Sequence, residues 1–198
     1  MAYYPIFLEL EKCPCLVVGG GEVAYRKAAA LVSCGAIVSV VSPRLGRGLQ
    51  RLARQGKVRW RRHTFTLKDL NGVQLVVAAT DDQPVNERVS WLARRRGIFV
   101  NVVDQPKLCS FIVPSVVRRG KLVLAISTGG ASPALAKWIR RDVENRYGSE
   151  FGQLLKGMAR VRGRVLKKVP GVARRKRLFE QALQAYFRVI DEKTVPGT

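Results

Sequence analysis

Cys15-Leu-Val-Val-Gly-Gly-Gly-Glu-Val-Ala24 is a short apolar run that ends in a glycine cluster. Its spacing, Gly19-x-Gly21-x-x-Ala24, matches the turn of a dinucleotide-binding βαβ unit. In that turn the first glycine permits a sharp bend, the second lets the backbone approach a pyrophosphate, and the small third residue allows a helix to pack closely on a strand. The N–H groups at the start of the next helix would face the phosphates. Because a helical pattern follows the run, we favour a dinucleotide site over a plain structural turn.

Strand-like and helix-like segments alternate after this turn. Apolar, β-branched runs predict strands over 15–18, 36–42, 58–65, 73–80 and 99–104, and helical spacing predicts helices over 22–34, 45–55 and 84–96. The run over 73–80 is continuously apolar, which indicates an interior strand. Strands separated by short helices predict an α/β fold with a Rossmann-like, doubly wound parallel sheet.

The pattern changes after residue 110. Two strands, 111–117 and 122–127, are predicted on either side of Arg118-Arg119-Gly120-Lys121, a hairpin signal. A helix follows to about residue 147, with Ser132 as N-cap and Pro133 in its first turn. Helical spacing resumes over 151–190, with a break at Pro170-Gly171. We therefore expect three parts, over 1–112, 113–148 and 149–198.

The composition is typical of a globular protein, and we expect a cytoplasmic one. Hydrophobic residues make up 47% of the 198 residues, which is enough for a substantial core. No apolar run approaches the ~20 residues of a membrane span, and no basic segment followed by a long apolar stretch suggests a signal peptide. Four cysteines, Cys13, Cys15, Cys34 and Cys109, are then expected to be reduced.

The formal net charge of +22 is the second strong feature. Nucleic acid, an anionic membrane surface or a polyanionic small molecule would each be attracted by such a charge. Basic residues gather between 151 and 177, where no acidic residue occurs. No helix-turn-helix, zinc or ribonucleoprotein signature accompanies them, so we disfavour a nucleic-acid partner. We also expect no membrane partner, because no apolar run is long enough to span a bilayer. A second basic group, Arg44, Arg47, Arg51 and Arg54, follows the second predicted strand.

The segment after that strand leaves the choice of dinucleotide open. About twenty residues after the glycines, an aspartate or glutamate normally binds the ribose 2′-hydroxyl of NAD. This chain has Ser42-Pro43-Arg44 there, with no carboxylate. Arg44 would favour the 2′-phosphate of NADP. Alternatively, Ser42 and nearby backbone groups would bind an NAD ribose while Arg44 points elsewhere.

Four blocks of sequence together resemble one family, in order and spacing, between about residues 5 and 141. They are Gly19-Gly-Gly-Glu-Val-Ala24 with Arg26-Lys27; Ala78-Ala-Thr-Asp-Asp82 with Val85-Asn86; Asn101-Val-Val-Asp104 with Pro106-Lys107 and Ser110-Phe-Ile-Val-Pro-Ser115; and Ser127-Thr-Gly-Gly-Ala-Ser-Pro133. The chain thus resembles the precorrin-2 dehydrogenase family, also called the siroheme synthase N-terminal module. Some of its members are also sirohydrochlorin ferrochelatases.

The resemblance implies an NAD-dependent oxidation in siroheme and tetrapyrrole biosynthesis. Precorrin-2 loses a hydride to nicotinamide and a proton to a base, and sirohydrochlorin results. The resemblance also implies a homodimer, with an NAD-binding Rossmann domain over 1–112, a dimerisation segment over 113–148 and a helical domain over 149–198. Insertion of Fe²⁺ to give siroheme stays open for this chain. The eight carboxylates of precorrin-2 would account for part of the basic charge.

The same resemblance places the site residues. Asp104 falls on the family's key acidic residue and is the catalytic candidate. The cofactor-binding candidates are Gly19, Gly21, Glu22, Val23, Ala24, Ser42, Pro43, Arg44, Thr80 and Asp81, and the substrate-binding candidates are Asn101, Lys107, Ser127 and Thr128. No metal-binding residue is predicted, because the single histidine, His63, lies far from these blocks.

Some roles stay open on the residues alone. Asp104 ends a predicted strand, where a base would meet a substrate, but it could instead cap the next turn. Asp82 could belong to the site or cap the helix at Pro84, and Lys107 could meet a substrate carboxylate or solvent. Two rival functions also remain: a nucleic-acid-binding module, and an NAD-binding regulatory subunit without tetrapyrrole turnover.

Overall fold

The computed structural model describes residues 3–194, which form two compact units. The first unit ends at Val113 and the second begins at Pro114. The finer division of the second unit into a dimerisation segment and a basic helical domain stays a prediction. Residues 1–2 and 195–198 of the predicted parts lie outside the described residues.

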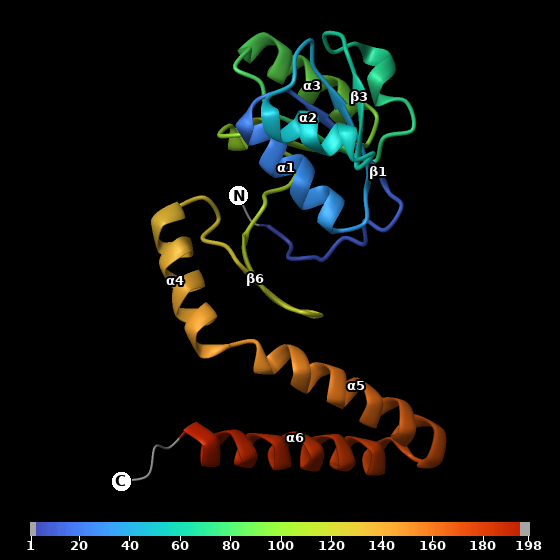
Figure 1. Cartoon of the computed structure of the whole chain (residues 1–198), viewed down its shortest axis with the longest axis vertical. Helices are drawn as coiled ribbons and strands as arrows, with labels where there is room; N and C mark the ends of the chain where they lie inside the picture. Colours follow the sequence, from blue (N-terminus) through green and yellow to red (C-terminus); the bar gives the residue numbers. More distant parts are fainter. Residues whose placement is uncertain (1–2, 195–198) are drawn as a thin grey trace. The chain divides into compact units, whose positions relative to one another are not determined.

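The first unit contains a five-stranded sheet in which every neighbouring pair of strands is parallel. Its order is β3-β2-β1-β4-β5, and the strands are β1 (Pro14–Val18), β2 (Ile37–Val41), β3 (Val58–Arg61), β4 (Leu75–Ala78) and β5 (Phe99–Val102) (Figure 1). At the end of β1, Val18 lies between Val41 of β2 and Ala78 of β4. The predicted Rossmann-like parallel sheet is confirmed.

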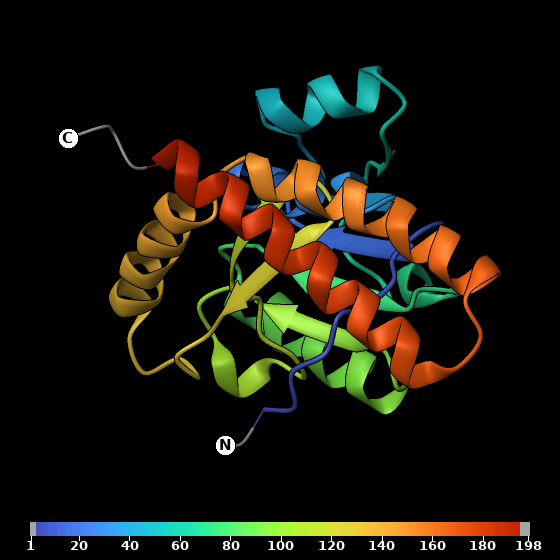
Figure 2. The same cartoon turned by 90° about the horizontal axis from the view of Figure 1, so that it is seen from below.

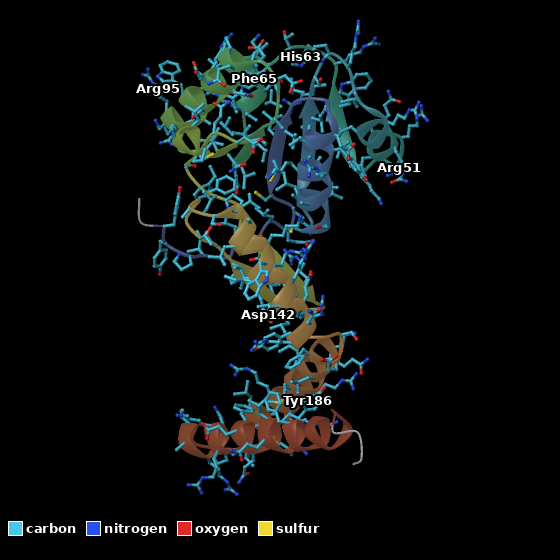
Figure 3. All side chains as sticks on the ribbon, turned by 90° about the vertical axis from the view of Figure 1, so that its left-hand side faces the viewer. Arg51, His63, Phe65, Arg95, Asp142 and Tyr186 are labelled. Carbon is cyan, nitrogen blue, oxygen red and sulfur yellow. The ribbon has the colours of Figure 1, made fainter. Side chains whose placement is uncertain are left out.

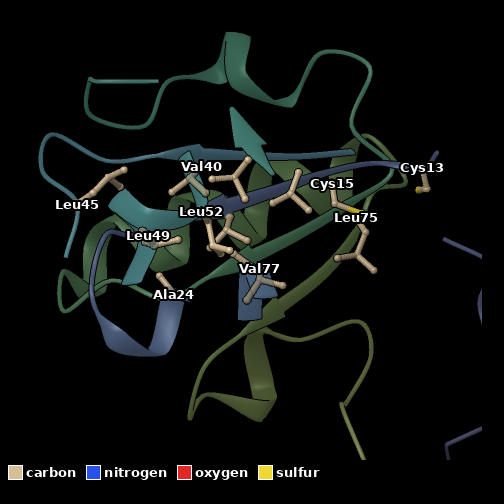
Figure 4. Close-up of a cluster of buried hydrophobic side chains, with 13 residues drawn as sticks. Cys13, Cys15, Ala24, Val40, Leu45, Leu49, Leu52, Leu75 and Val77 are labelled. Carbon is tan, nitrogen blue, oxygen red and sulfur yellow. The ribbon is translucent and has the colours of Figure 1, made fainter. Parts of the chain in front are cut away.

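Helices cover both faces of this sheet because successive strand residues point to opposite sides. On one face, Val40 lies in one buried cluster with Ala24 of α1 (Glu22–Ser33) and Leu49 of α2 (Arg47–Arg54) (Figure 4). On the other face, Leu16 packs with Val89 of α3 (Gln83–Arg95). Leu49 is 0% exposed, and burial of such a side chain contributes about 1.5–3 kcal/mol.

The cysteines near β1 belong to this core. Cys15 is 1% exposed, and its burial, with a further contribution from the neighbouring thiol of Cys13, raises the pKa of Cys15 to about 12. The thiol therefore stays protonated at neutral pH, as a structural residue would. The Cys13 thiol donates a hydrogen bond to Gln74 Oε1 at 3.3 Å.

Strand β3 ends four residues earlier than predicted. A capping box stops it: Asp69 Oδ2 accepts hydrogen bonds from Thr66 N at 2.8 Å and from Thr66 Oγ1 at 3.0 Å. The 3₁₀ turn η1 (Leu67–Leu70) follows. Phe65 is buried in the second core cluster, which explains why its apolar character extended the predicted strand.

Asp82 is the N-cap of α3, and this position supplies a stability prediction. Its Oδ1 accepts a hydrogen bond from Val85 N at 3.1 Å, and Pro84 occupies the first turn. We expect Asp82→Ala to lower the free energy of unfolding by about 1 kcal/mol, or the melting temperature by roughly 2–4 °C. Asp81→Ala removes the same charge from the preceding exposed residue and should change stability by less than about 0.5 kcal/mol. Equal losses in thermal melts would contradict the capping role.

The second unit begins with an antiparallel pair, β6 (Ser115–Arg119) and β7 (Leu122–Ile126). Strand β6 starts four residues later than predicted, because the segment before it is attached to β5 of the first unit's sheet: Ser110 N donates to Val100 O at 2.8 Å, and Asn101 Nδ2 donates to Phe111 O at 3.1 Å. Pro114, which has no N–H, separates the two segments.

Three helices complete the second unit: α4 (Pro133–Arg146), α5 (Glu150–Lys168) and α6 (Val172–Thr194). The Ser132 hydroxyl accepts a hydrogen bond from Leu135 N at 3.2 Å, which confirms the predicted cap. The predicted break at Pro170-Gly171 separates α5 from α6 in the sequence, and the two helices pack side by side in space (Figures 1 and 2). The ring centroids of Phe151 and Phe187 lie 6.4 Å apart between the two helices, although Phe187 is 40% exposed. No helix over residues 3–194 is long and apolar enough to cross a bilayer.

Candidate dinucleotide site and Asp104 loop

The candidate site lies at the carboxyl edge of the sheet, where β1 and β4 are neighbours. The chain runs outward from β1 through β2 to β3 and then returns to β4 on the other side of β1. Ligands bind at such a switch point, because the loops that leave the two strands diverge there. Gly19 N donates to Val41 O at 3.0 Å and Ala79 N donates to Val18 O at 2.8 Å, so both loops start from fixed positions.

Glycine is required at different positions of the first loop for different structural reasons. Gly19 has a φ of +129°, and a Cβ built on it would lie 2.2 Å from Ala79 O. Gly21 has no atom within 4 Å of a built Cβ, so open space adjoins its backbone. Ala24 is completely buried against the sheet. The turn is thus tight at its first glycine, open at Gly21 and closely packed at the third motif position.

The start of α1 fits a pyrophosphate. Gly21 is the N-cap and provides no side-chain cap, and the first helical bond runs from Tyr25 N to Gly21 O. The N–H groups of Glu22, Val23 and Ala24 precede that bond, so they lack intrahelical acceptors and carry the positive end of the helix dipole. Open space beside Gly21 and these donors suit the phosphates of NAD, and the predicted cofactor residues of this block lie together here.

Gly20, to which the motif assigned no role, contacts the segment after β2. A Cβ on Gly20 would lie 2.0 Å from Arg44 O and 2.5 Å from Ser42 Oγ, and Gly46 N donates to Gly20 O at 2.8 Å. Ser42, Pro43 and Arg44 are therefore packed against the glycine turn. The sequence contained no signal for this contact, because it joins segments more than twenty residues apart.

Asn86 holds the loop after β4. Its Nδ2 donates to Thr80 O at 2.9 Å, and Thr80 Oγ1 donates to Asn86 Oδ1 at 2.8 Å. Asn86 is buried, whereas Asp81 is exposed next to the loop. The sequence pattern assigns Asn86 no role of its own, and the structure shows that it shapes the Thr80 loop.

Asp104 lies in the loop just beyond β5, in a left-handed conformation with φ +58°. The Cys109 thiol stabilises the loop from inside: Val102 N donates to Cys109 Sγ at 3.1 Å, and the thiol contacts Gln105 O at 3.3 Å. The Asp104 side chain is exposed, and over residues 3–194 its carboxylate has no hydrogen-bond or ion-pair partner. Gln105, not Asp104, is the N-cap of the next turn, η2 (Pro106–Leu108). Over residues 3–194, no hydrogen bond of the Asp104 carboxylate supports its alternative role as a turn cap.

A depression of about 500 Å³ lies beside this carboxylate. It is lined by Gln83 and Glu87 of α3 and by residues 104–108. Lys107 is exposed at this depression, and Gln105 Nε2 donates to Gln83 Oε1 across it. The depression thus brings the carboxylates of Asp104 and Glu87 together with the ammonium group of Lys107 near the tip of β5.

The remaining substrate candidates have local partners. Asn101 is 7% exposed, and its Nδ2 is used by Phe111 O. In the second unit, Ser127 Oγ accepts from Gly129 N at 3.1 Å, and Thr128 Oγ1 donates to Ser132 O at 3.0 Å. These bonds shape the turn before α4. Substrate contacts of Asn101, Ser127 and Thr128 stay predictions.

Over residues 3–194 no group of three histidine, cysteine, aspartate or glutamate side chains is placed to hold a metal ion. His63 instead contacts Asp69, with Nε2 3.5 Å from Oδ1. Asp69 also pairs with Arg61 Nη1 at 3.1 Å. These contacts belong to the capping box after β3.

Comparison with known proteins agrees with this geometry. Residues 6–115 match the family described as putative NAD(P)-binding, and residues 119–146 match the one described as sirohaem biosynthesis protein central. The siroheme synthases of Methylococcus capsulatus and Nitrosococcus oceani are 45% and 42% identical over 184 residues, which is 93% of this chain and 39% of each relative. The chain thus spans about two-fifths of these relatives.

A solved structure matches both units. SirC, a precorrin-2 dehydrogenase, has a TM-score of 0.77 and 29% sequence identity to this chain. The match covers 90% of this chain and 88% of SirC.

Proposed function

We propose that this chain, which belongs to the family described as putative NAD(P)-binding and is similar to siroheme synthases over 93% of its length, oxidises precorrin-2 to sirohydrochlorin with NAD as the hydride acceptor. One observation carries the proposal. The unpartnered Asp104 carboxylate lies at the same carboxyl edge of the sheet as the phosphate-binding turn at Gly21, with β4 between their strands. A proton acceptor and a dinucleotide site on one edge are what this oxidation needs.

The residues divide the work. Gly21 and the N–H groups at the start of α1 bind the pyrophosphate. When bound, the oxidised nicotinamide supplies the hydride acceptor. Asp104 accepts the proton that precorrin-2 releases as the hydride leaves, and a carboxylate without other partners is available for that transfer. Lys107, at the same depression, pairs with a carboxylate at the rim of the macrocycle.

The net charge of +22 suits a substrate with eight carboxylates, because a positive field attracts and orients it. We place the reaction in the cytoplasm and assign it to a homodimer, with 113–148 as the dimerisation segment. Ser127, in the turn before α4, then donates its hydroxyl proton to a substrate carboxylate, whereas the Thr128 hydroxyl proton is committed to Ser132 O and Thr128 shapes the turn.

A second reaction uses the same carboxylate. Insertion of Fe²⁺, as a substrate, into sirohydrochlorin releases two pyrrole N–H protons, and Asp104 is placed to accept a proton or to hold the incoming ion by oxygen ligation. In this reaction the macrocycle nitrogens supply the other ligands of the ion.

The test mixes the protein with precorrin-2 and NAD and follows NADH formation together with the absorption spectrum of sirohydrochlorin. We expect equal amounts of the two products. Binding of NAD without turnover would instead support a regulatory subunit, and saturable binding of nucleic acid without NAD binding would support a nucleic-acid module. Fe²⁺ is then added to sirohydrochlorin with and without enzyme, and equal rates would remove the second reaction.

A further inference from the structure

The adenosine end of the proposed cofactor site is free of acidic side chains. No aspartate or glutamate occurs between Glu22 and Asp69, a span that includes β2, α2 and β3. The one acid that ends this span, Asp69, is 3% exposed and is occupied by Arg61 and Thr66. A carboxylate after β2 is what binds the ribose 2′-hydroxyl of NAD and repels the 2′-phosphate of NADP. This discriminating group is missing from the loop.

Ser42, the residue directly after β2, does not replace it. Its hydroxyl donates to Arg44 O at 2.7 Å, its carbonyl accepts from Trp60 Nε1 at 2.9 Å, and its N–H donates to Arg61 O at 3.2 Å. Ser42 is also only 9% exposed. Its one hydroxyl proton is committed to the turn, so the residue holds the loop rather than donating to a ribose.

Arg44 is attached directly to the phosphate-binding turn. Its carbonyl lies against Gly20, where a built Cβ would come within 2.0 Å of it, and Gly46 N closes the loop on Gly20 O. The exposed Arg44 side chain therefore starts beside the turn that holds the pyrophosphate. The 2′-position of the adenosine ribose lies on the β2 side of that pyrophosphate in Rossmann folds.

Three nearby arginines are engaged elsewhere, whereas Arg47 at the start of α2 has, over residues 3–194, no side-chain partner. Arg51 Nη2 donates to Tyr25 Oη at 3.1 Å, Arg61 pairs with Asp69, and Arg62 stacks on Trp60 at 5.6 Å. Figure 3 shows Arg51 and His63, both exposed, on this unit. Over the described residues Arg44 has no such partner. Its guanidinium retains all its donors for a phosphate, which it binds as a fork.

We infer that Arg44 is the residue that accepts a 2′-phosphate, so that this chain binds NADP as well as NAD. The inference rests on the proposed function, because it assumes that the glycine turn holds a dinucleotide. It adds a specificity-determining residue, and it predicts that the oxidation proceeds with either acceptor.

The test is equilibrium binding, so it does not depend on turnover. NADP⁺ and NAD⁺ are titrated by calorimetry into the wild-type chain and into Arg44→Gln and Arg54→Gln. Arg54 lies at the other end of α2, and its replacement removes the same charge. We expect the wild type to bind both dinucleotides with dissociation constants within about threefold, because no carboxylate opposes the phosphate. Arg44→Gln should weaken NADP⁺ binding by about tenfold or more and NAD⁺ binding by less than about threefold. Arg54→Gln should change neither by more than about threefold.

Two further variants test whether the charge at position 44 determines the affinity for NADP⁺. Arg44→Lys keeps the charge and should retain part of the NADP⁺ affinity, and Arg44→Glu should reject NADP⁺ by about a hundredfold while binding NAD⁺. Circular dichroism establishes that each variant is folded. Wild-type binding of NAD⁺ with NADP⁺ at least a hundredfold weaker, or equal losses in Arg44→Gln and Arg54→Gln, would overturn the inference and leave the proposed function standing. Failure to bind either dinucleotide would overturn both.

Discussion

Replacement of Asp104 by asparagine is expected to lower the rate of precorrin-2 oxidation by ~10²–10⁴-fold, the usual contribution of a positioned general base. The amide has nearly the same shape as the carboxylate, but it accepts a proton far less readily. Because Asp104 lies beyond β5 and the phosphate-binding turn lies after β1, the dissociation constant of NAD should change by less than about threefold. The measurements are initial rates of NADH formation and a calorimetric NAD titration.

Asparagine is the right substitution because of the backbone. Asp104 has a φ of +58°, a conformation that asparagine and aspartate tolerate better than other residues with side chains. Alanine there would combine loss of the carboxylate with backbone strain of about 1–2 kcal/mol. Asp104→Gly offers a second test, since glycine adopts this φ freely and removes the side chain entirely. Both variants should lose turnover and keep the fold.

A carboxylate on the same depression provides the matched control. Glu87 of α3 lines the depression beside Asp104, and its Oε1 accepts a hydrogen bond from Gln83 Nε2 at 2.8 Å. Glu87→Gln removes the same charge without touching the proposed base, so the rate should stay within about threefold of the wild type. If Glu87→Gln and Asp104→Asn lower the rate equally, the effect is electrostatic and Asp104 is not the base.

The features that the sequence predicted well are local. The glycine turn and the Ser132 cap each depend on residues within a few positions of one another. The role of Asp82, which the sequence left open, is equally local, since its carboxylate caps α3. The apolar runs of β1 and β4 likewise indicate burial on both faces, because helices cover both sides of a parallel sheet. Such patterns are sufficient for the order of elements and for the fold class.

Some of the features that it missed join distant segments, and others are local contacts that the apolar pattern concealed. Phe65 made 58–65 resemble one strand, but the Thr66–Asp69 capping box ends it at Arg61. The apolar segment from Phe111 resembled the start of a hairpin, but Asn101 and Val100 attach it to β5. The fit of Arg44 O against Gly20 joins residues that no local pattern connects, and the support of the Asp104 loop by the Cys109 thiol is local but has no sequence signature. These contacts shape the candidate site, so the sequence indicated its residues and not its geometry.

Substitutions of Gly19 and Gly21 by alanine should have different effects, the first on the stability of the fold and the second on cofactor binding. Gly19→Ala places a Cβ 2.2 Å from Ala79 O at a φ of +129°, so a backbone clash adds to conformational strain. We expect the free energy of unfolding to fall by about 3 kcal/mol or more, and the melting temperature by roughly 10 °C. Thermal melts monitored by circular dichroism measure the change.

Gly21→Ala should have the opposite signature. Gly21 has a φ of −82°, and a Cβ built on it has no protein atom within 4 Å. The free energy of unfolding should therefore change by only about 0.5 kcal/mol. The same Cβ stands in the space that the pyrophosphate needs, so the dissociation constant of NAD should rise by about 10–100-fold through weakened N–H contacts with the phosphates. A Gly21→Ala chain that binds NAD like the wild type would show that the diphosphate does not lie at this turn, and the proposed dehydrogenase would lose its cofactor site.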